Sequence, residues 1–289
     1  MEDTKSFKPI KSWQDLKFTD DYMFKKTMEA EDICIDTLNA FLSWDISRIT
    51  YFEKEKALKA YYDTKGVQLD VYVRDEIERI YDVEMQVRKM QEKKEEQKTD
   101  AMTSLAKRAR FYQSEIDTDL LLKGALYSDL RPTLIMFLCP FKIFGGKRAI
   151  YHFKRTCMED PKLTLPDETE FIFISSKGDR KGLSKRACAI LDYMDGKESN
   201  DPLIKRIAAR ISAIKRSETE ERDYVTYEMR LREERAEGRK EGIKEGINKG
   251  EARATKLLKS LMDLGRMDDV SRVLTDKAYR DKLYIEYHL

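Results

Sequence analysis

The amino-acid sequence predicts an α/β domain built on a mixed β-sheet, followed by a charged helical extension. Two observations predict the domain: three strand-like runs in its first half, and a continuous apolar run between two prolines further on. A third predicts the extension, because Lys, Arg and Glu become abundant and proline is absent after Pro202. We place the boundary near Asp201, which gives a domain of residues 15–200 and an extension of residues 201–289.

The composition is that of a folded protein with a core of useful size. Of 289 residues, 41% are hydrophobic, and 56 basic side chains against 54 acidic ones leave a formal charge of +2. This overall charge neither favours nor excludes nucleic acid, so any basic surface must be local. The sequence has no apolar leader and no run of the roughly 18 apolar residues that a membrane helix needs. We therefore expect a cytoplasmic protein without a membrane partner.

The four cysteines show no CxxC pairing, which argues against a zinc site or a dense set of disulfides. We expect buried, reduced thiols. They are Cys34, Cys139, Cys157 and Cys188.

The N-terminal half of the domain predicts helices followed by a meander of strands. Apolar residues at helical spacing predict two helices within 18–43. Three runs of strand-forming residues follow, at 47–55, 66–74 and 79–88. The turn between the last two runs is so short that only an antiparallel hairpin can join them.

The second half of the domain returns to helix and then to buried strands. Residues 89–117 are polar, lack Gly and Pro, and carry an apolar stripe, so they predict a long helix. The apolar run at 133–139 predicts a strand that is buried on both faces. Further strands are predicted at 149–157 and 170–176, with helices from about residue 183 onward.

The predicted hairpin carries two acidic residues where strands seldom have them. Side chains alternate along a strand, so Asp70 on one strand and Glu84 and Gln86 on the other converge on the same side. Two neighbouring carboxylates repel each other unless a cation lies between them, and Mg²⁺ prefers such oxygen ligands. The amide of Gln86 could orient a water molecule or a phosphate oxygen. The alternative is a solvated outer face whose polar residues serve solubility alone.

The segment GVQLDVYVRDEIERIYDVEMQVRK (66–89), with FTDDYMFKKTM, RARFYQSEI and LLKGALYSDLRPTLIMFL, resembles a known family. This is the Rpn family of recombination-promoting nucleases, also described as PD-(D/E)xK nuclease family transposases. The resemblance runs from about residue 18 to 176, and the EGxK repeat at 237–250 is similar to C-terminal segments of that family. It implies a restriction-endonuclease-like core and DNA cleavage that depends on Mg²⁺ or Mn²⁺, in recombination or mobile-element biology. The sequence contains no sequence-specific DNA reader such as a zinc finger or a basic zipper, so we expect little sequence specificity.

The resemblance also implies roles for single residues. It makes Asp70 and Glu84 the metal ligands. It places Gln86 where the superfamily usually has a catalytic lysine, and many members of this branch also have glutamine there. An extra acid from the first helix often completes such sites, and Asp20 and Asp21 are the candidates. An Asp before a helix is also a common N-cap residue.

Basic residues follow the predicted hairpin and are candidates for binding DNA phosphates on either side of the cut. The alternative is a solvated helix face. The candidates are Arg88, Lys89, Lys107, Arg108 and Arg110.

The extension contains an internal repeat, with glycine at every fourth position from Gly238 to Gly250. On a helix these glycines form one narrow stripe, which could pack on a second chain and make a homo-oligomer. The alternative is a spacer that carries one or two small terminal helices. Two other functions remain open at this point: a catalytically degenerate DNA-binding or protein-interaction module, and an assembly protein that works through the repeat.

Overall fold

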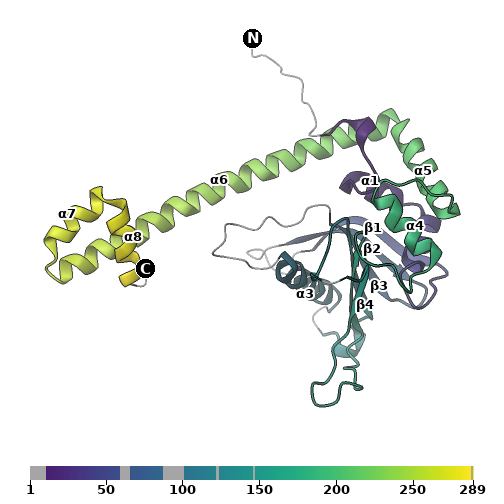
Figure 1. Ribbon diagram of the computed structural model, residues 1–289, viewed down its shortest axis with the longest axis horizontal. Helices are drawn as coiled ribbons and strands as arrows, with labels where there is room; N and C mark the ends of the chain where they lie inside the picture. Colours follow the sequence, from purple (N-terminus) through teal and green to yellow (C-terminus); the bar gives the residue numbers. More distant parts are fainter. Residues whose placement is uncertain (1–10, 59–65, 87–100, 122–123, 146, 288) are drawn as a thin grey trace, which may run out of the picture. The chain divides into compact units, whose positions relative to one another are not determined.

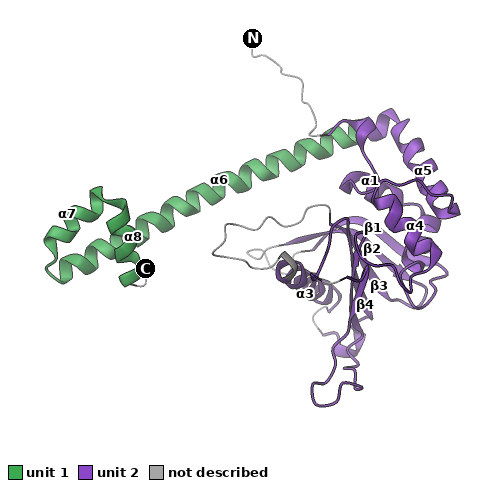
Figure 2. Ribbon diagram, in the orientation of Figure 1, with its two compact units in different colours: residues 1–10, 222–289 green, residues 11–221 purple. Residues whose placement is uncertain are grey.

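The computed structural model describes residues 11–58, 66–86, 101–121, 124–145, 147–287 and 289. The chain divides into two compact units, which Figure 2 shows in different colours. We call Lys11–Glu221 the sheet unit and Arg222–Leu289 the C-terminal unit.

The sheet unit is built on one mixed sheet of six strands in the order β1-β2-β3-β4-β6-β5 (Figure 1). β1, β2 and β3 form an antiparallel meander, β3, β4 and β6 run parallel, and β5 is antiparallel to β6. The sequence predictions of a hairpin and of a mixed sheet are therefore confirmed. The strands are β1 (Ile49–Leu58), β2 (Val67–Asp75), β3 (Ile80–Met85), β4 (Thr133–Cys139), β5 (Ile150–Phe153) and β6 (Thr169–Ser175).

Helices cover both faces of this sheet. Helix α3 lies on one side, and α1, α4 and α5 lie together on the other (Figure 1). Helix α5 packs against α1, α2 and α4. The helices are α1 (Asp21–Met28), α2 (Glu31–Asn39), α3 (Ala101–Leu120), α4 (Lys185–Met194) and α5 (Pro202–Lys215), with short 3-10 helices at Trp13–Asp15 and Tyr127–Asp129.

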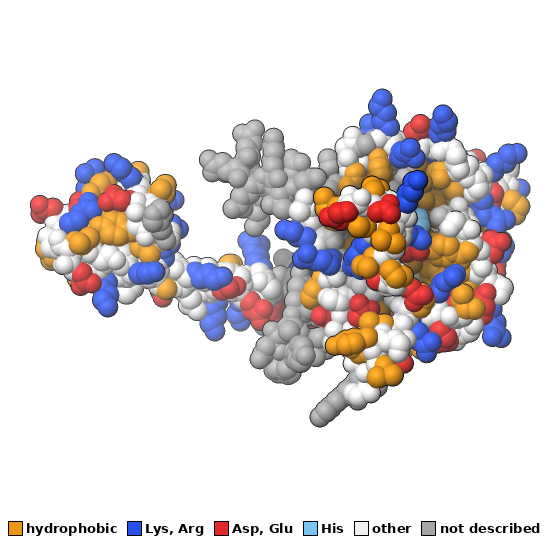
Figure 3. Space-filling view, turned by 90° about the horizontal axis from the view of Figure 1, so that it is seen from below, with side chains coloured by type: hydrophobic (Ala, Val, Ile, Leu, Met, Phe, Trp, Pro, Cys, Tyr) orange, Lys and Arg blue, Asp and Glu red, His pale blue; other side chains and the backbone are white. Residues whose placement is uncertain are grey.

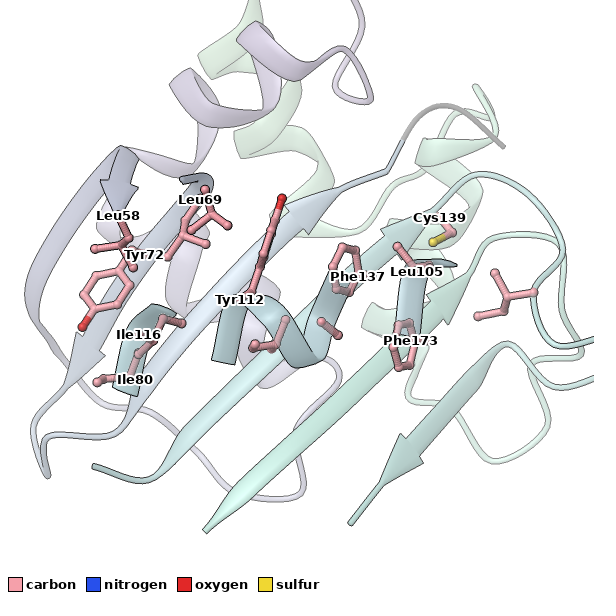
Figure 4. Close-up of a cluster of buried hydrophobic side chains, with 14 residues drawn as sticks. Leu58, Leu69, Tyr72, Ile80, Leu105, Tyr112, Ile116, Phe137, Cys139 and Phe173 are labelled. Atoms are coloured by element: carbon pink, nitrogen blue, oxygen red, sulfur yellow. The ribbon is translucent and has the colours of Figure 1, made fainter. Parts of the chain in front are cut away.

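The core beneath α3 fixes this helix on the sheet. Figure 4 shows Tyr112 and Ile116 of α3 among side chains of the strands, including Phe137 and Phe173. The rings of Phe137 and Phe173 are stacked with their centroids 5.5 Å apart. Every residue of β4 is buried, as predicted for the apolar run between two prolines.

Two expected boundaries differ from the structure. The strand predicted at 149–157 ends at Phe153, because β5 is an edge strand that pairs only with β6 before the chain turns into a loop.

The predicted domain boundary near Asp201 precedes α5, yet α5 belongs to the sheet unit. Its apolar side chains, among them Leu203 and Ile207, are fully buried. Composition did not reveal this, because the exposed face of α5 is as charged as the extension that follows.

The remaining chain forms the predicted charged helical extension. Helix α6 (Glu218–Asp263) is followed by α7 (Met267–Thr275) and α8 (Lys277–Glu286). The end of α6 packs with α7 and α8 around a small core that includes Leu257, Leu261 and Leu283. Figure 3 shows basic and acidic side chains interspersed on this unit, around an apolar area. No helix in the described part of the chain is both long enough and apolar enough to span a bilayer.

Candidate active site

The two predicted acids lie where β2 and β3 stop pairing. The last pairs of this ladder include Val71 with Val83, and beyond them side chains replace the backbone partners. The amide N–H of Asp70 donates to Oε1 of Glu84 (2.8 Å), and the amide N–H of Met85 donates to Oδ2 of Asp70 (3.0 Å). Each carboxylate thus satisfies a backbone donor of the opposite strand, and the two side chains are interlocked.

The second oxygen of each carboxylate is paired with a cation. Nζ of Lys25 lies 3.2 Å from Oδ1 of Asp70, and Nη2 of Arg108 lies 2.8 Å from Oε2 of Glu84. Lys25 belongs to α1 and Arg108 to α3, so the two cations come from helices on opposite sides of the sheet (Figure 1). Positive charge is therefore concentrated at the two carboxylate oxygens that the backbone leaves available.

Packing holds both cations in place. Lys25 is 6% exposed, and its Nζ also contacts Oδ2 of Asp21 (2.9 Å) and Oε1 of Glu55 (3.3 Å). The guanidinium of Arg108 lies over the rings of Tyr112 and Phe137, with its Cζ 5.2 and 5.0 Å from the two ring centroids. Ion pairs with three carboxylates and contacts with two aromatic rings therefore fix the positions of the two cationic groups.

The carboxyl groups themselves are shifted toward their neutral forms. Burial, followed by the neighbouring Asp82, raises the pKa of Glu84 to about 8. Burial, followed by Glu84, also raises the pKa of Asp70, against the opposing effect of Lys25. Such shifts identify a place where additional positive charge would be stabilised.

Asp82 adds a third acid beside this pair. It lies on β3 two residues before Glu84, is fully buried, and neither of its carboxylate oxygens has a hydrogen-bond partner among the described residues. Burial and then Asp70 raise the pKa of Asp82 well above its usual value. The alternation of β3 puts Asp82 on the same face as Glu84, but a strand pattern alone does not indicate that this carboxylate is fully buried.

Glu55 was missed by sequence reasoning. It lies on β1 between Lys54, which pairs with Val71, and Lys56, which pairs with Leu69, so it is adjacent to Asp70. Its φ is +55°, a conformation that residues other than glycine adopt rarely and at a cost in free energy. Its only sequence signal is the alternation of Glu and Lys along β1, which does not distinguish it from its neighbours.

The two candidate acids of the first helix have different positions. Asp20 is the N-cap residue of α1, and its carboxylate accepts from the amide N–H of Lys17 (2.6 Å) and pairs with Lys11. Neither contact connects Asp20 to Asp70 or Glu84. Asp21 is connected to the site through its ion pair with Lys25.

The remaining predicted residues are placed only in part. Gln86 follows β3, is half-buried, and donates its backbone N–H to the carbonyl of Leu138 (2.9 Å). Lys107 and Arg110 are exposed on α3. Arg108, also a candidate for binding DNA phosphates, is half-buried, and its guanidinium donates to Oε2 of Glu84 (2.8 Å). The candidates Arg88 and Lys89 lie outside the described residues.

The burial of these acids rules out a purely solvated outer face. Glu84 is 2% exposed and Asp82 is not exposed at all, so neither serves solubility. Within the described ranges, no three His, Cys, Asp or Glu side chains are gathered as a metal cluster. A Mg²⁺ ion bound mainly by waters and phosphate needs only one or two carboxylates, so the pair Asp70 and Glu84 suffices.

The sequence was compared with protein-family models, curated proteins and solved structures. No curated protein and no solved structure matches the chain. A family model described as PD-(D/E)XK nuclease family transposase matches residues 18–240, which include every strand of the sheet and most of the 289 residues. Helices on both faces of a six-stranded mixed sheet, with paired acids where two strands part, are consistent with that fold. The chain therefore belongs to the PD-(D/E)XK nuclease family of transposases.

Proposed function

We propose that this protein is a metal-dependent DNA endonuclease that hydrolyses phosphodiester bonds with little sequence specificity. Its metal, Mg²⁺ or Mn²⁺, would be bound by Asp70 and Glu84, and Gln86 would orient a water molecule or a phosphate oxygen. Family membership supports a nuclease linked to mobile elements. The choice of metal, substrate and residues is our proposal.

The observation that carries the proposal is that each of the two carboxylates has one oxygen bonded to the backbone and the other next to a cation. Oδ2 of Asp70 and Oε1 of Glu84 are bonded to the backbone, while Oδ1 and Oε2 meet Lys25 and Arg108. The pair is thus fixed by the backbone on one side and electrostatically matched to positive charge on the other. A site that needs no rearrangement of its backbone to accept a cation is pre-organised for one.

The donor set fits a hard divalent cation. Both proposed ligands are carboxylates, and burial raises the pKa of Glu84 to about 8, so a nearby cation would favour its ionised form. When bound, such a metal activates water and neutralises charge on the phosphate that is cut. The guanidinium of Arg108, 2.8 Å from Oε2 of Glu84, would lie beside such a metal, and a guanidinium in this position is suited to bind a phosphate oxygen.

DNA binding would depend mainly on phosphate contacts. Lys107 and Arg110 are exposed on α3, next to Arg108 at the site. Phosphate contacts carry no sequence information and weaken as salt concentration rises. We therefore expect weak sequence preference and a steep salt dependence of DNA binding.

The test is conversion of supercoiled plasmid to nicked or linear DNA at low salt, with Mg²⁺, Mn²⁺ or EDTA. We expect cutting only with metal, and a loss of about 100-fold or more in Asp70→Asn and Glu84→Gln, which keep the side-chain shape. Glu78→Gln is the matched control, because Glu78 lies in the turn at the opposite end of the same hairpin and contacts Arg74 instead of the site. Circular dichroism confirms that each variant is folded.

A second candidate function is a DNA-binding module that does not cut DNA. Gln86 carries no charge, so the site lacks a cation at the position where the family motif has lysine. If the folded wild-type protein shifts DNA in a gel but does not cut it with either metal, the protein is a DNA-binding module on a nuclease fold. If it neither binds nor cuts DNA, a protein-interaction module or an assembly protein that works through the extension replaces both readings.

We also propose that the chain forms a homo-oligomer through its extension. Residues 232–253 of α6 are exposed throughout, including Ile243 and Ile247 beside the glycine stripe. An isolated helix that contains four glycines is poorly stable in water, and each glycine costs about 1 kcal/mol relative to alanine. Seven acidic and seven basic side chains between Glu228 and Glu251 make this surface nearly neutral, which suits a second copy better than DNA.

A further inference from the structure

Lys25 is unusual among the lysines near the site. It is 6% exposed, and its ammonium contacts three carboxylates, those of Asp21, Glu55 and Asp70, at 2.9, 3.3 and 3.2 Å. Most lysine side chains are exposed, and a lysine is seldom buried this deeply unless it is paired with an acid. Asp70 is one of the two proposed metal ligands, so Lys25 lies in direct contact with the machinery of the site.

The neighbouring lysine provides a comparison within the same helix. Lys26 is also largely buried, but its ammonium contacts Glu29 (3.8 Å) and Glu220 (2.8 Å), and neither acid belongs to the site. Both lysines therefore hold α1 in place through ion pairs. Of the two, Lys25 is the one whose ammonium also contacts acids on the sheet, Glu55 of β1 and Asp70 of β2.

The motif on β3 lacks the charge that Lys25 carries. The family description has lysine two positions after the second acid, whereas this chain reads Glu84-Met85-Gln86. An amide can donate and accept hydrogen bonds, but it carries no positive charge at any pH. Hydrolysis of a phosphodiester builds negative charge on the phosphate and requires deprotonation of the attacking water, and both are favoured by a nearby ammonium.

We propose that Lys25 is the catalytic cation of this site and supplies from α1 the charge that the β3 motif lacks. The assignment rests on the proposed nuclease function. The ammonium lies 3.2 Å from Oδ1 of Asp70, where it would donate a hydrogen bond to the attacking water or to an oxygen of the scissile phosphate. Glu55 and Asp21 hold the ammonium beside Asp70, which explains why two further acids are gathered around a single lysine.

The experiment removes this charge and then restores it at the position of the motif. Lys25→Met keeps the length of the side chain and removes the ammonium, and Lys26→Met is the matched control on the same helix. The double variant Lys25→Met/Gln86→Lys places a lysine two residues after Glu84. The measured quantities are the rate of plasmid nicking at saturating Mg²⁺, DNA binding in EDTA by gel shift, and the thermal midpoint of unfolding.

We expect Lys25→Met to slow nicking by at least 100-fold while it binds DNA within threefold of wild type. Lys26→Met should keep the wild-type rate within about threefold, and the double variant should regain at least tenfold over Lys25→Met. Nicking by Lys25→Met within threefold of the wild-type rate would overturn the assignment. So would an equal loss in Lys26→Met, which would indicate a general weakening of α1, or the absence of any gain in the double variant.

Removing Lys25 leaves buried acids without their partner, so a charge-balanced pair is included in case Lys25→Met does not fold. Lys25→Met/Glu55→Gln removes one acid together with the ammonium, and it is compared with Glu55→Gln alone. The assignment predicts that the double variant is at least 100-fold slower than Glu55→Gln, and equal rates would overturn it. Wild-type protein is assayed in parallel. If wild type does not cut, the nuclease proposal itself fails; if wild type and the lysine variants cut equally, only the role of Lys25 fails.

Discussion

At the scale of single residues, the site depends on how Glu84 is shared between the sheet and Arg108. One oxygen of Glu84 accepts from the backbone of Asp70, and the other is 2.8 Å from Arg108. If Glu84 holds the proposed metal, the metal and the guanidinium of Arg108 would compete for this carboxylate.

This competition gives a prediction for Arg108→Met. Without metal, the variant leaves a buried carboxylate oxygen without its partner, which should lower the free energy of unfolding by about 1–3 kcal/mol. A bound metal restores the missing charge, so the stabilisation by Mg²⁺ should be larger in the variant than in wild type. Thermal or urea unfolding with Mg²⁺ and with EDTA measures the difference.

Lys107→Met is the control for this measurement, since Lys107 is exposed beside Arg108. It should change neither the stability nor the effect of Mg²⁺. Equal stabilisation of wild type and Arg108→Met by Mg²⁺ would mean that the metal and Arg108 do not share Glu84.

Residue patterns predicted only the part of the site that is local in sequence. Alternation along two adjacent strands brought Asp70 and Glu84 to the same side, because a hairpin fixes both the pairing and the faces. The cations could not be found in this way. Lys25 and Lys26 are neighbours in one helix, and only the packing of α1 against β2 determines which of them reaches Asp70.

At the scale of elements, α6 presents four exposed glycines. Among the residues that the structure describes, a Cβ added at Gly238, Gly242, Gly246 or Gly250 meets nothing within 4 Å. Packing against the described residues therefore does not require glycine at these positions. If the stripe packs on a second chain, the added methyl groups matter only in the oligomer.

Changing all four glycines to alanine separates helix propensity from association. We expect greater helix content by circular dichroism, because each change favours the helix by about 1 kcal/mol. We also expect a shift from oligomer to monomer, measured by light scattering after size-exclusion chromatography. Asn248→Ala is the control, since it raises helix propensity on the opposite face of α6 and should leave association unchanged. An unchanged oligomer in the glycine variant would locate the interface elsewhere.

The elements that sequence reasoning predicted well are those with strong local signals. β4 was predicted over its full length because prolines flank an apolar run, and the hairpin was predicted because its turn is short. α5 was assigned to the extension because its exposed residues are charged, although its buried stripe faces α1, α2 and α4. Periodicity shows that a helix has a buried face, but it does not show which partner covers that face.

At the scale of the whole molecule, the chain consists of two units that each have a core. The sheet unit includes α5 and the first turn of α6, where Glu220 accepts a hydrogen bond from the hydroxyl of Tyr22 (3.0 Å) and pairs with Lys26 (2.8 Å). The sheet unit therefore ends at Glu221, and the candidate active site lies within it.

This division predicts the behaviour of two fragments. Residues 11–221 should fold cooperatively and keep metal-dependent cutting, whereas residues 11–200 should not fold. The shorter fragment loses five buried apolar side chains of α5, each worth about 1.5–3 kcal/mol, against a typical stability of about 5–15 kcal/mol. Thermal unfolding and plasmid nicking of both fragments test this. A folded, active 11–200 fragment would show that α5 is dispensable, and an inactive but folded 11–221 fragment would give the extension a part in catalysis.

The interlocking of Asp70 and Glu84 with the backbone has a consequence for the history of such proteins. Because each carboxylate replaces a missing partner in the ladder between β2 and β3, selection for a stable fold preserves both acids even in a lineage that has stopped cutting DNA. A relative that retains the two acids is therefore not shown to be active by that fact.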